Sequence, residues 1–293
     1  MKAFIIGASG LVGSHCAKHF RDNNWEVVGT HFSYATDETV SFDFETTELS
    51  DFFKEKDFFP DVIVHCAALT NVDYCENNKE ESYRKTVLPT IKIVDFCKSS
   101  NIVLVYISTD YVFDGLTGPY VEDDLVKPLN VYGEHKLESE NLVSRLDKHL
   151  ILRITNVFGE EKRSKNFIAR LVDDLRNKVE KSLKLPFDQY ATPIYAGDIA
   201  RMSLLLISDN KTGIYHLGGT DYYNRYQLAH KVKSYFYGSE TLTLTPVATA
   251  IANQTAVRPL MGGLLNKKFI KEYPEFTFEN VDSFISKVLT NEL

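Results

Sequence analysis

The sequence has little of what membrane, secreted or nucleic-acid-binding proteins require. No apolar run approaches the ~20 residues of a membrane-spanning helix, so no membrane association is expected. The apolar segment after Lys2 ends at Gly7, which is too short for a signal peptide, and a cytoplasmic location is expected. Lys and Arg total 33 against 40 Asp and Glu, and this net charge of -7 disfavours a nucleic-acid partner.

Cysteine is scarce and forms no metal-binding or disulfide pattern. The four cysteines are Cys16, Cys66, Cys75 and Cys97, and none belongs to a CxxC pair, so we expect reduced thiols. His15 and His19 have the spacing of a zinc-protease helix, but Cys16 stands where that motif has glutamate. We therefore expect ordinary histidines and no metal site.

What is present is a globular composition in which strand-like and helix-like segments alternate. Hydrophobic residues make up 44% and charged residues 25%. Strands are expected at 3–7, 26–30, 40–42, 61–65, 102–107, 150–154 and 213–217, and helices at 11–23, 79–98, 131–146, 166–178, 196–207, 224–237 and 278–289. The alternation predicts an α/β fold, a doubly wound, Rossmann-like parallel sheet. We expect residues 1–155 plus about 191–217 to form the dinucleotide-binding domain, and about 156–190 plus 218–293 a smaller mixed substrate-binding lobe.

A glycine-rich turn joins the first predicted strand to the first helix. Its sequence is GASGLVG, and the residues expected to bind a cofactor are Gly7, Ser9, Gly10, Leu11, Val12 and Gly13. The first glycine permits a tight turn, the second a close approach of the pyrophosphate, and the third the packing of helix on strand. The helix N-terminus offers free N–H groups to an anion. The alternative is a glycine-rich turn without a ligand, but the strand–turn–helix context favours a dinucleotide.

The region after the second strand bears on which dinucleotide binds. An acid in this region would bind the ribose 2′-hydroxyl of NAD, but the sequence there is GTHFS, without an acid. His31 and Ser33 can donate hydrogen bonds to a 2′-phosphate, so NADP is expected and NAD is the alternative. Asp43, followed by Phe44, is a candidate partner for the adenine amino group, or else a cap at the strand end.

Tyr132 and Lys136 have the spacing of a proton-donating pair. Residues four apart share one face of a helix, and a lysine ammonium favours the phenolate, which lowers a tyrosine's pKa. The pair alone is also a common surface pattern. Upstream, Ser108 and Thr109 end an apolar strand at its carboxyl end, where such sheets bind ligands. Thr109 is our first choice for the hydroxyl that polarises a substrate carbonyl, although both hydroxyls can simply cap the strand.

Several motifs together resemble the extended short-chain dehydrogenases/reductases, and among them the dTDP-4-dehydrorhamnose reductases. The most specific is STDYVFDG at 108–115, followed in the family's order by PLNVYG at 128–133 and KLE at 136–138. HCAA at 65–68 and TNVD at 70–73 resemble the segment that lines the nicotinamide side. Later matches are LR at 152–153, NF at 166–167, DQ at 188–189 and RP at 258–259. The likeness covers nearly the whole chain.

The resemblance implies roles for these residues. It implies that Tyr132 is the acid, that Lys136 binds the nicotinamide ribose and that Thr109 contacts the substrate carbonyl. Ala67, Ala68 and Thr70 would lie at the nicotinamide. Ser108, Thr109, Asp110, Tyr111, Phe113, Asn156 and Arg258 would contact a nucleotide-sugar substrate, with Arg258 at its diphosphate. Three departures concern the proton relay and the sugar: Thr86 replaces the usual asparagine, Asn156 the usual tryptophan, and Met261-Gly262-Gly263 the usual polar residues.

Three functions follow from the residues and the resemblance. The first is NAD(P)H-dependent reduction of a nucleotide-linked 4-keto-6-deoxysugar. The alternative is a non-catalytic dinucleotide-binding subunit, because the regulatory beta subunit of methionine adenosyltransferase resembles the same family. A sugar-nucleotide epimerase or dehydratase is less favoured, since dehydratases carry an Asp-Glu pair where Asp110 is followed here by Tyr111. A homodimer is compatible with the sequence.

Overall fold

A seven-stranded parallel sheet forms the centre of the molecule. The computed structural model describes residues 1–161, 163, 165–237 and 239–290. The sheet order is β3-β2-β1-β4-β5-β6-β9, and each neighbouring pair is parallel. The strands are β1 (Lys2–Ile6), β2 (Glu26–His31), β3 (Thr39–Ser41), β4 (Val62–His65), β5 (Val103–Thr109), β6 (His149–Ile154) and β9 (Gly213–Leu217).

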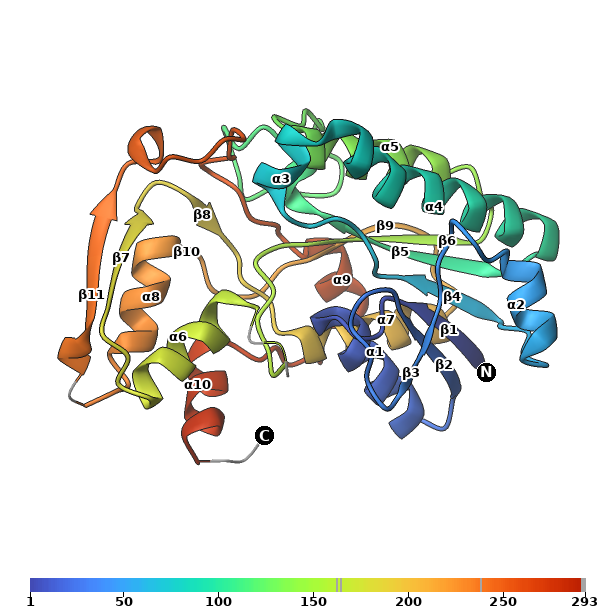
Figure 1. The fold of residues 1–293 in the computed structure, drawn as a ribbon, viewed down its shortest axis with the longest axis horizontal. Helices are drawn as coiled ribbons and strands as arrows, with labels where there is room; N and C mark the ends of the chain where they lie inside the picture. The colour runs from blue at the N-terminus through green and yellow to red at the C-terminus, as the bar shows by residue number, and fades with distance from the viewer. Residues whose placement is uncertain (162, 164, 238, 291–293) are drawn as a thin grey trace.

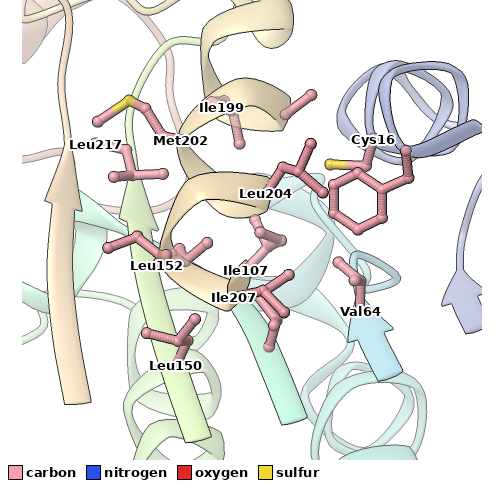
Figure 2. Close-up of a cluster of buried hydrophobic side chains, with 14 of the residues drawn as sticks. Cys16, Val64, Ile107, Leu150, Leu152, Ile199, Met202, Leu204, Ile207 and Leu217 are labelled. Carbon is pink, nitrogen blue, oxygen red and sulfur yellow. The ribbon is translucent and has the colours of Figure 1, made fainter. Parts of the chain in front are cut away.

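Helices cover both faces of this sheet (Figure 1). One face carries α1 (Leu11–Asp22) and α7 (Ala196–Ser208), and the other carries α2 (Leu49–Glu55), α4 (Lys79–Ser100) and α5 (Val131–Val143). Alternate strand residues point to opposite faces, so Ile5 packs under α1 while Phe4 packs under α2 and α4. Figure 2 shows the first of these cores, where Cys16 of α1 and Met202 of α7 meet strand side chains. Both faces are therefore sealed from water, as a parallel sheet requires.

The sheet has one reversal of strand order, between β1 and β4. The chain builds outward from β1 through β2 to β3, then returns to place β4 on the other side of β1. The connections that leave the carboxyl ends of β1 and β4 diverge at this point. Open α/β sheets bind ligands in the crevice outside such a switch point. The topology thus assigns the ligand site to the edge where Gly7 follows β1 and Cys66 follows β4.

A smaller mixed lobe stands beyond the carboxyl ends of the strands. It contains α6 (Phe167–Arg176), α8 (Arg225–Lys233) and α10 (Val281–Thr290), which share one apolar core. Two small sheets complete it: β7 (Lys181–Pro186) pairs in parallel with β11 (Leu242–Val247), and β8 (Tyr190–Ala191) pairs antiparallel with β10 (Tyr223–Asn224). In Figure 1 this lobe lies at the opposite end from the N-terminus. Among the described residues no helix combines the length and apolarity needed to cross a membrane.

The expected fold class is confirmed, and the differences concern short elements. The sequence did not indicate the helices α2, α3 (Val72–Asn77) and α9 (Lys267–Glu272), nor the two small sheets. The division into two domains stays a prediction. One segment assigned to the smaller lobe, α9, packs against β9, and Phe269 belongs to the core of the large sheet.

A buried ion pair joins the sheet to helix α5. Arg153 of β6 donates to Glu140 of α5 at 2.7 Å, and both side chains are 3% exposed. The Cζ of Arg153 lies 5.1 Å from the centroid of the Phe113 ring, and its Nη1 lies 3.3 Å from the Nε2 of His216 in β9. Because Glu140 follows Lys136 by one helical turn, this pair fixes α5 against the strands at the height of the expected catalytic residues.

Removing one partner of this pair should strongly destabilise the fold. Glu140→Ala leaves the Arg153 guanidinium buried without a carboxylate, which costs about 3–5 kcal/mol. Urea unfolding of the variant should show this loss in the free energy of unfolding. Glu138→Ala, at an exposed position of the same helix, is the matched control and should change stability by less than about 1 kcal/mol. Equal effects of the two substitutions would contradict the assigned role.

Candidate active site

One cavity at the carboxyl edge of the sheet collects most of the predicted site residues. Its volume is about 800 Å³. Its walls include the predicted cofactor residues Gly7, Ser9, Gly10, Leu11, Val12, Gly13, His31, Ser33, Asp43, Phe44, Ala67, Ala68 and Thr70. They also include Ser108, Thr109, Asp110, Tyr111, Tyr132, Lys136 and Asn156. Residues from most of the chain's first half thus meet where the topology places a ligand.

Two glycines of the turn, Gly7 and Gly13, stand where a side chain would not fit. Gly7 has a φ of +83°, and a Cβ on it would lie 3.0 Å from the backbone nitrogen of Ala67. A Cβ on Gly13 would lie 2.3 Å from the Gly7 carbonyl oxygen, so α1 could not pack this closely on β1. The first turn of α1 carries no acidic residue. Its N-cap residue is Gly10, so no side chain caps the N–H groups at the start of the helix. This cradle fits the pyrophosphate of a dinucleotide.

The end of the cavity that is predicted to hold the adenosine lies between the ends of β2 and β3. The Nδ1 of His31 lies 2.9 Å from the Thr39 hydroxyl, so its Nε2 is the ring nitrogen available to a ligand. Asp43 accepts a hydrogen bond of 2.9 Å from the backbone nitrogen of Glu45, which makes it a turn-capping residue as well as a cavity residue. The Phe44 ring packs edge-on against Phe42 in the core. The stretch GTHFS at 29–33, at the end of β2, contains no acidic residue.

Thr109 and Tyr132 meet at the inner end of the cavity. Burial raises the pKa of Tyr132, and the Thr109 hydroxyl acts in the opposite direction by hydrogen bonding. The phenol is therefore protonated at neutral pH. The Tyr111 ring stands edge-on to Tyr132 with 5.7 Å between centroids. The Thr109 oxygen accepts from the backbone nitrogen of Tyr111 at 3.2 Å, which fixes the hydroxyl at the strand end.

Lys136 is buried beneath this pair. Its ammonium donates to the carbonyl of Ile107 at 2.6 Å and lies 4.0 Å from the Tyr106 ring centroid. Burial lowers the pKa of Lys136 to about 7, and the Glu140 carboxylate acts in the opposite direction. The lowering of the Tyr132 pKa expected from Lys136 is not seen in the ligand-free protein, because burial of the phenol raises that pKa instead. Lysine and tyrosine thus share one helix face and one cavity, as their spacing predicts.

Two further polar side chains at the carboxyl end of β5, Ser108 and Asp110, differ in their hydrogen bonding. The Asp110 carboxylate accepts from the Thr155 hydroxyl at 2.6 Å and from the backbone nitrogen of Gly263 at 3.3 Å. Burial raises the pKa of Asp110. The Ser108 hydroxyl lines the cavity and, within the described chain, has no hydrogen-bond partner although it is buried. An orphaned buried hydroxyl beside Thr109 suits a ligand oxygen.

Two predicted substrate residues are not brought to the cavity. Phe113 is fully buried and stacks on Tyr120 with 4.3 Å between ring centroids, so it packs under the site and does not face a sugar. Arg258 is absent from the cavity wall. Its guanidinium pairs with Asp73 at 3.0 Å and donates to the Ala256 carbonyl at 2.9 Å, so its charge is already balanced by the chain.

The structure adds cationic residues that the sequence did not single out. Arg163 and Lys165, from the loop between β6 and α6, line the cavity. Arg225, the first residue of α8, stacks on Phe167 at 4.5 Å and makes no ion pair within the described residues. Burial raises the pKa of Tyr111, while the charges of Arg258 and Arg225 oppose this rise. Local sequence carried no signal that Arg163 and Lys165 would line the cavity, because the fold alone brings them there.

The histidine pair of α1 has no metal-binding neighbours. Among the described residues no group of three or more His, Cys, Asp or Glu side chains is placed to bind a metal ion. His15 instead contacts the loop after β6, with its Nε2 3.1 Å from the Glu160 carbonyl. The described cysteines are free thiols. The geometry therefore points to a dinucleotide cradle joined to a proton-donating tyrosine.

Comparison with known proteins agrees with this geometry. Residues 1–289 match the RmlD substrate binding domain family. The chain belongs to this family. A dTDP-4-dehydrorhamnose reductase of Aggregatibacter actinomycetemcomitans is 32% identical over 260 residues, which is 85% of this chain and 84% of that protein. The resemblance indicated by the motifs is thereby confirmed.

Two other similarities broaden the comparison. The methionine adenosyltransferase 2 subunit beta of Xenopus laevis is 34% identical over 239 residues, covering 78% of this chain and 70% of that protein. The structure of a Bacillus anthracis dTDP-4-dehydrorhamnose reductase in complex with NADP has the same fold, with a TM-score of 0.83, 23% identity and 99% of each chain covered. The chain thus resembles both reductases and a subunit of a different enzyme.

The low pKa of Lys136 predicts a dependence of stability on pH in the ligand-free protein. Between about pH 7 and the ordinary lysine pKa of 10.5, Lys136 binds more protons in the unfolded chain than in the folded one. Its contribution to the free energy of unfolding therefore rises with pH. Lys136→Met lacks this contribution. Wild type should therefore gain stability relative to the variant as pH rises through this window, and below pH 7 the difference should be constant. Urea unfolding at about pH 6, 8 and 10 measures it, and parallel curves would contradict the assignment.

Proposed function

We propose that this protein reduces the keto group of a nucleotide-linked 4-keto-6-deoxysugar with NADPH. The observation that carries the proposal is one cavity in which a dinucleotide cradle leads to Thr109 and Tyr132, with Lys136 beneath them. The 32% identity to a dTDP-4-dehydrorhamnose reductase over most of both chains supports the same reaction. We place this reaction in the cytoplasm.

The residues of the chain account for the proton in this reaction. The dinucleotide, when bound, supplies the hydride to the sugar carbon. Tyr132 holds a proton at neutral pH because burial raises its pKa, and it donates that proton to the developing oxyanion. Thr109, and Ser108 with its unpartnered hydroxyl, orient the carbonyl oxygen. Lys136 stabilises the phenolate that remains.

NADPH is the proposed reductant, with NADH as the alternative. The stretch 29–33 at the end of β2 has no acidic residue that would repel a 2′-phosphate. The Bacillus anthracis relative whose structure contains NADP agrees with this choice. The glycine cradle serves either dinucleotide, because it contacts only the pyrophosphate.

Tyr132→Phe tests the proton donor. The substitution keeps the ring and removes the proton, so kcat for a 4-keto sugar nucleotide should fall roughly 10²–10⁴-fold while dinucleotide binding persists. Thr109→Val should lower kcat about 10–10³-fold, since it loses a donor that strengthens in the transition state. Continuous assays that follow NADPH absorbance, with dTDP-, GDP-, UDP- and CDP-linked 4-keto sugars as substrates, measure both changes in kcat. The exposed Tyr237→Phe is the control, and full activity in Tyr132→Phe would refute the mechanism.

The substrate diphosphate is proposed to lie against Arg225. Its guanidinium is unpaired within the described chain and stacked on Phe167, whereas Arg258 already pairs with Asp73. A planar guanidinium binds two phosphate oxygens at once. The nucleotide would then extend from Tyr111 into the smaller lobe, because α8 belongs to that lobe.

Arg225→Gln should raise KM for the sugar nucleotide about 10–100-fold and leave dinucleotide affinity unchanged. Arg258→Gln is the comparison, and its effect should be smaller because its charge is balanced by Asp73. Steady-state kinetics over a range of substrate concentrations separates KM from kcat. An unchanged KM in Arg225→Gln, with an increase in Arg258→Gln, would return the diphosphate to Arg258.

A second candidate function has specific support in the 34% identity to methionine adenosyltransferase 2 subunit beta. A regulatory subunit would use the same cradle to bind a dinucleotide without turnover. Purified protein that binds NADPH, reduces none of the four classes of 4-keto sugar nucleotide and co-purifies with a methionine adenosyltransferase would establish this function. Epimerase or dehydratase chemistry is disfavoured because Asp110 is bound by Thr155 and followed by Tyr111.

A further inference from the structure

The side chain of Arg163 lies at the end of the cavity that is predicted to hold the adenosine. Arg163 belongs to the loop between β6 and α6, and its guanidinium lies 4.8 Å from the ring centroid of Tyr34. Tyr34 follows Ser33 in the segment after β2, and Arg163, His31 and Ser33 all line the cavity. The loop after β6 therefore meets the segment where a Rossmann-type site contacts the 2′-position of the adenosine ribose.

Among the residues that the structure describes, no carboxylate pairs with Arg163. Five lysines and arginines line the cavity: Arg84, Lys85, Lys136, Arg163 and Lys165. Arg84 pairs with Glu45 at 2.7 Å, and Lys85 pairs with Glu81. Lys136 donates to a backbone carbonyl in the interior. Arg163 and Lys165 form no ion pair with any described carboxylate, and the nearby Glu161 accepts instead from Asn166 at 3.0 Å.

We propose that Arg163 binds the 2′-phosphate of NADP and so selects NADP over NAD. The proposal rests on the proposed function in one respect, that the cavity holds a dinucleotide. Stacking on Tyr34 holds the guanidinium plane and leaves its N–H edge free to contact two phosphate oxygens. Lys165 adds charge to the same end of the cavity. The segment after β2 has no arginine of its own, so the cation that it lacks comes from the other side of the cavity.

This arrangement connects cofactor choice with the substrate side of the site. The loop that carries Arg163 begins after β6 with Thr155 and Asn156, which line the cavity near Asp110. It ends at Asn166, whose side chain donates to the Gly159 carbonyl at 2.9 Å and caps α6 through Ala169. A phosphate bound by Arg163 would therefore contact the same loop that borders the substrate.

Calorimetric titration with NADPH, NADH and 2′,5′-ADP tests the proposal without requiring turnover. Wild type should bind NADPH more tightly than NADH. Arg163→Gln should weaken binding of NADPH and of 2′,5′-ADP about 10–100-fold while NADH affinity stays within about threefold. Arg163→Lys should recover part of the loss because it restores the charge. Tyr34→Leu removes the stacking ring and should cause a smaller loss, again confined to the two phosphate-bearing ligands.

Arg145→Gln, at an exposed position after α5, is the matched control and should bind all three ligands as wild type does. Equal weakening of NADPH and NADH in Arg163→Gln, or unchanged NADPH affinity, would overturn the role of Arg163 and leave the proposed reductase function in place. A wild-type protein that binds neither dinucleotide would remove both proposals. The advantage of NADPH over NADH in wild type should also shrink as salt is added, since charges at the cavity mouth are screened.

Discussion

The parallel direction of the seven strands is the constraint on which the site depends. Because every strand runs the same way, all carboxyl ends emerge at one edge, and the residues that follow them become neighbours whatever their separation in the chain. The glycine turn follows β1, Ala67 follows β4, Thr109 ends β5, and Thr155 follows β6. A reversal between β1 and β4 opens the crevice at which these ends meet. Loss of parallel pairing at this point would disperse the cradle and the proton donor together.

Much of the first half of the fold could be predicted from the sequence because its signals are local. Gly13 is required by a contact within one strand–turn–helix unit, and Tyr132 and Lys136 share one helix face. Both patterns can be recognised in a short stretch of sequence, without knowledge of the rest of the chain. The short strands β7 and β11 gave a weaker signal, since a two-stranded sheet buries little and tolerates exposed residues such as Thr243 and Pro246. Their existence depends on the packing of α8, which sequence periodicity does not report.

The residues misplaced or missed in the site share a different cause. Phe113 lies in a motif of the substrate site, but its direction is set by stacking on Tyr120. Arg258 was expected at a diphosphate, whereas the charge that it could offer is balanced by Asp73 on a distant helix. The roles proposed for Arg163 and Arg225 follow only from their contacts in the folded chain. Whether an arginine is free for a ligand depends on which carboxylates approach it in space, and a single sequence does not contain that information.

The position of the C-terminal segment 256–264 has a consequence for the order in which the site is completed during synthesis. This segment crosses the catalytic edge late in the chain: the Gly263 nitrogen donates to Asp110, the Ala256 nitrogen donates to Asp73, and Asn130 donates to the Val257 carbonyl. The ribosome makes β1 to β6, the glycine turn and Tyr132 long before it makes these residues. A nascent chain can therefore form its glycine turn before the groups that segment 256–264 provides to Asp73, Asp110 and Asn130 have been synthesised. The surroundings of Asp110 are thus completed later in synthesis than the strand end that presents it.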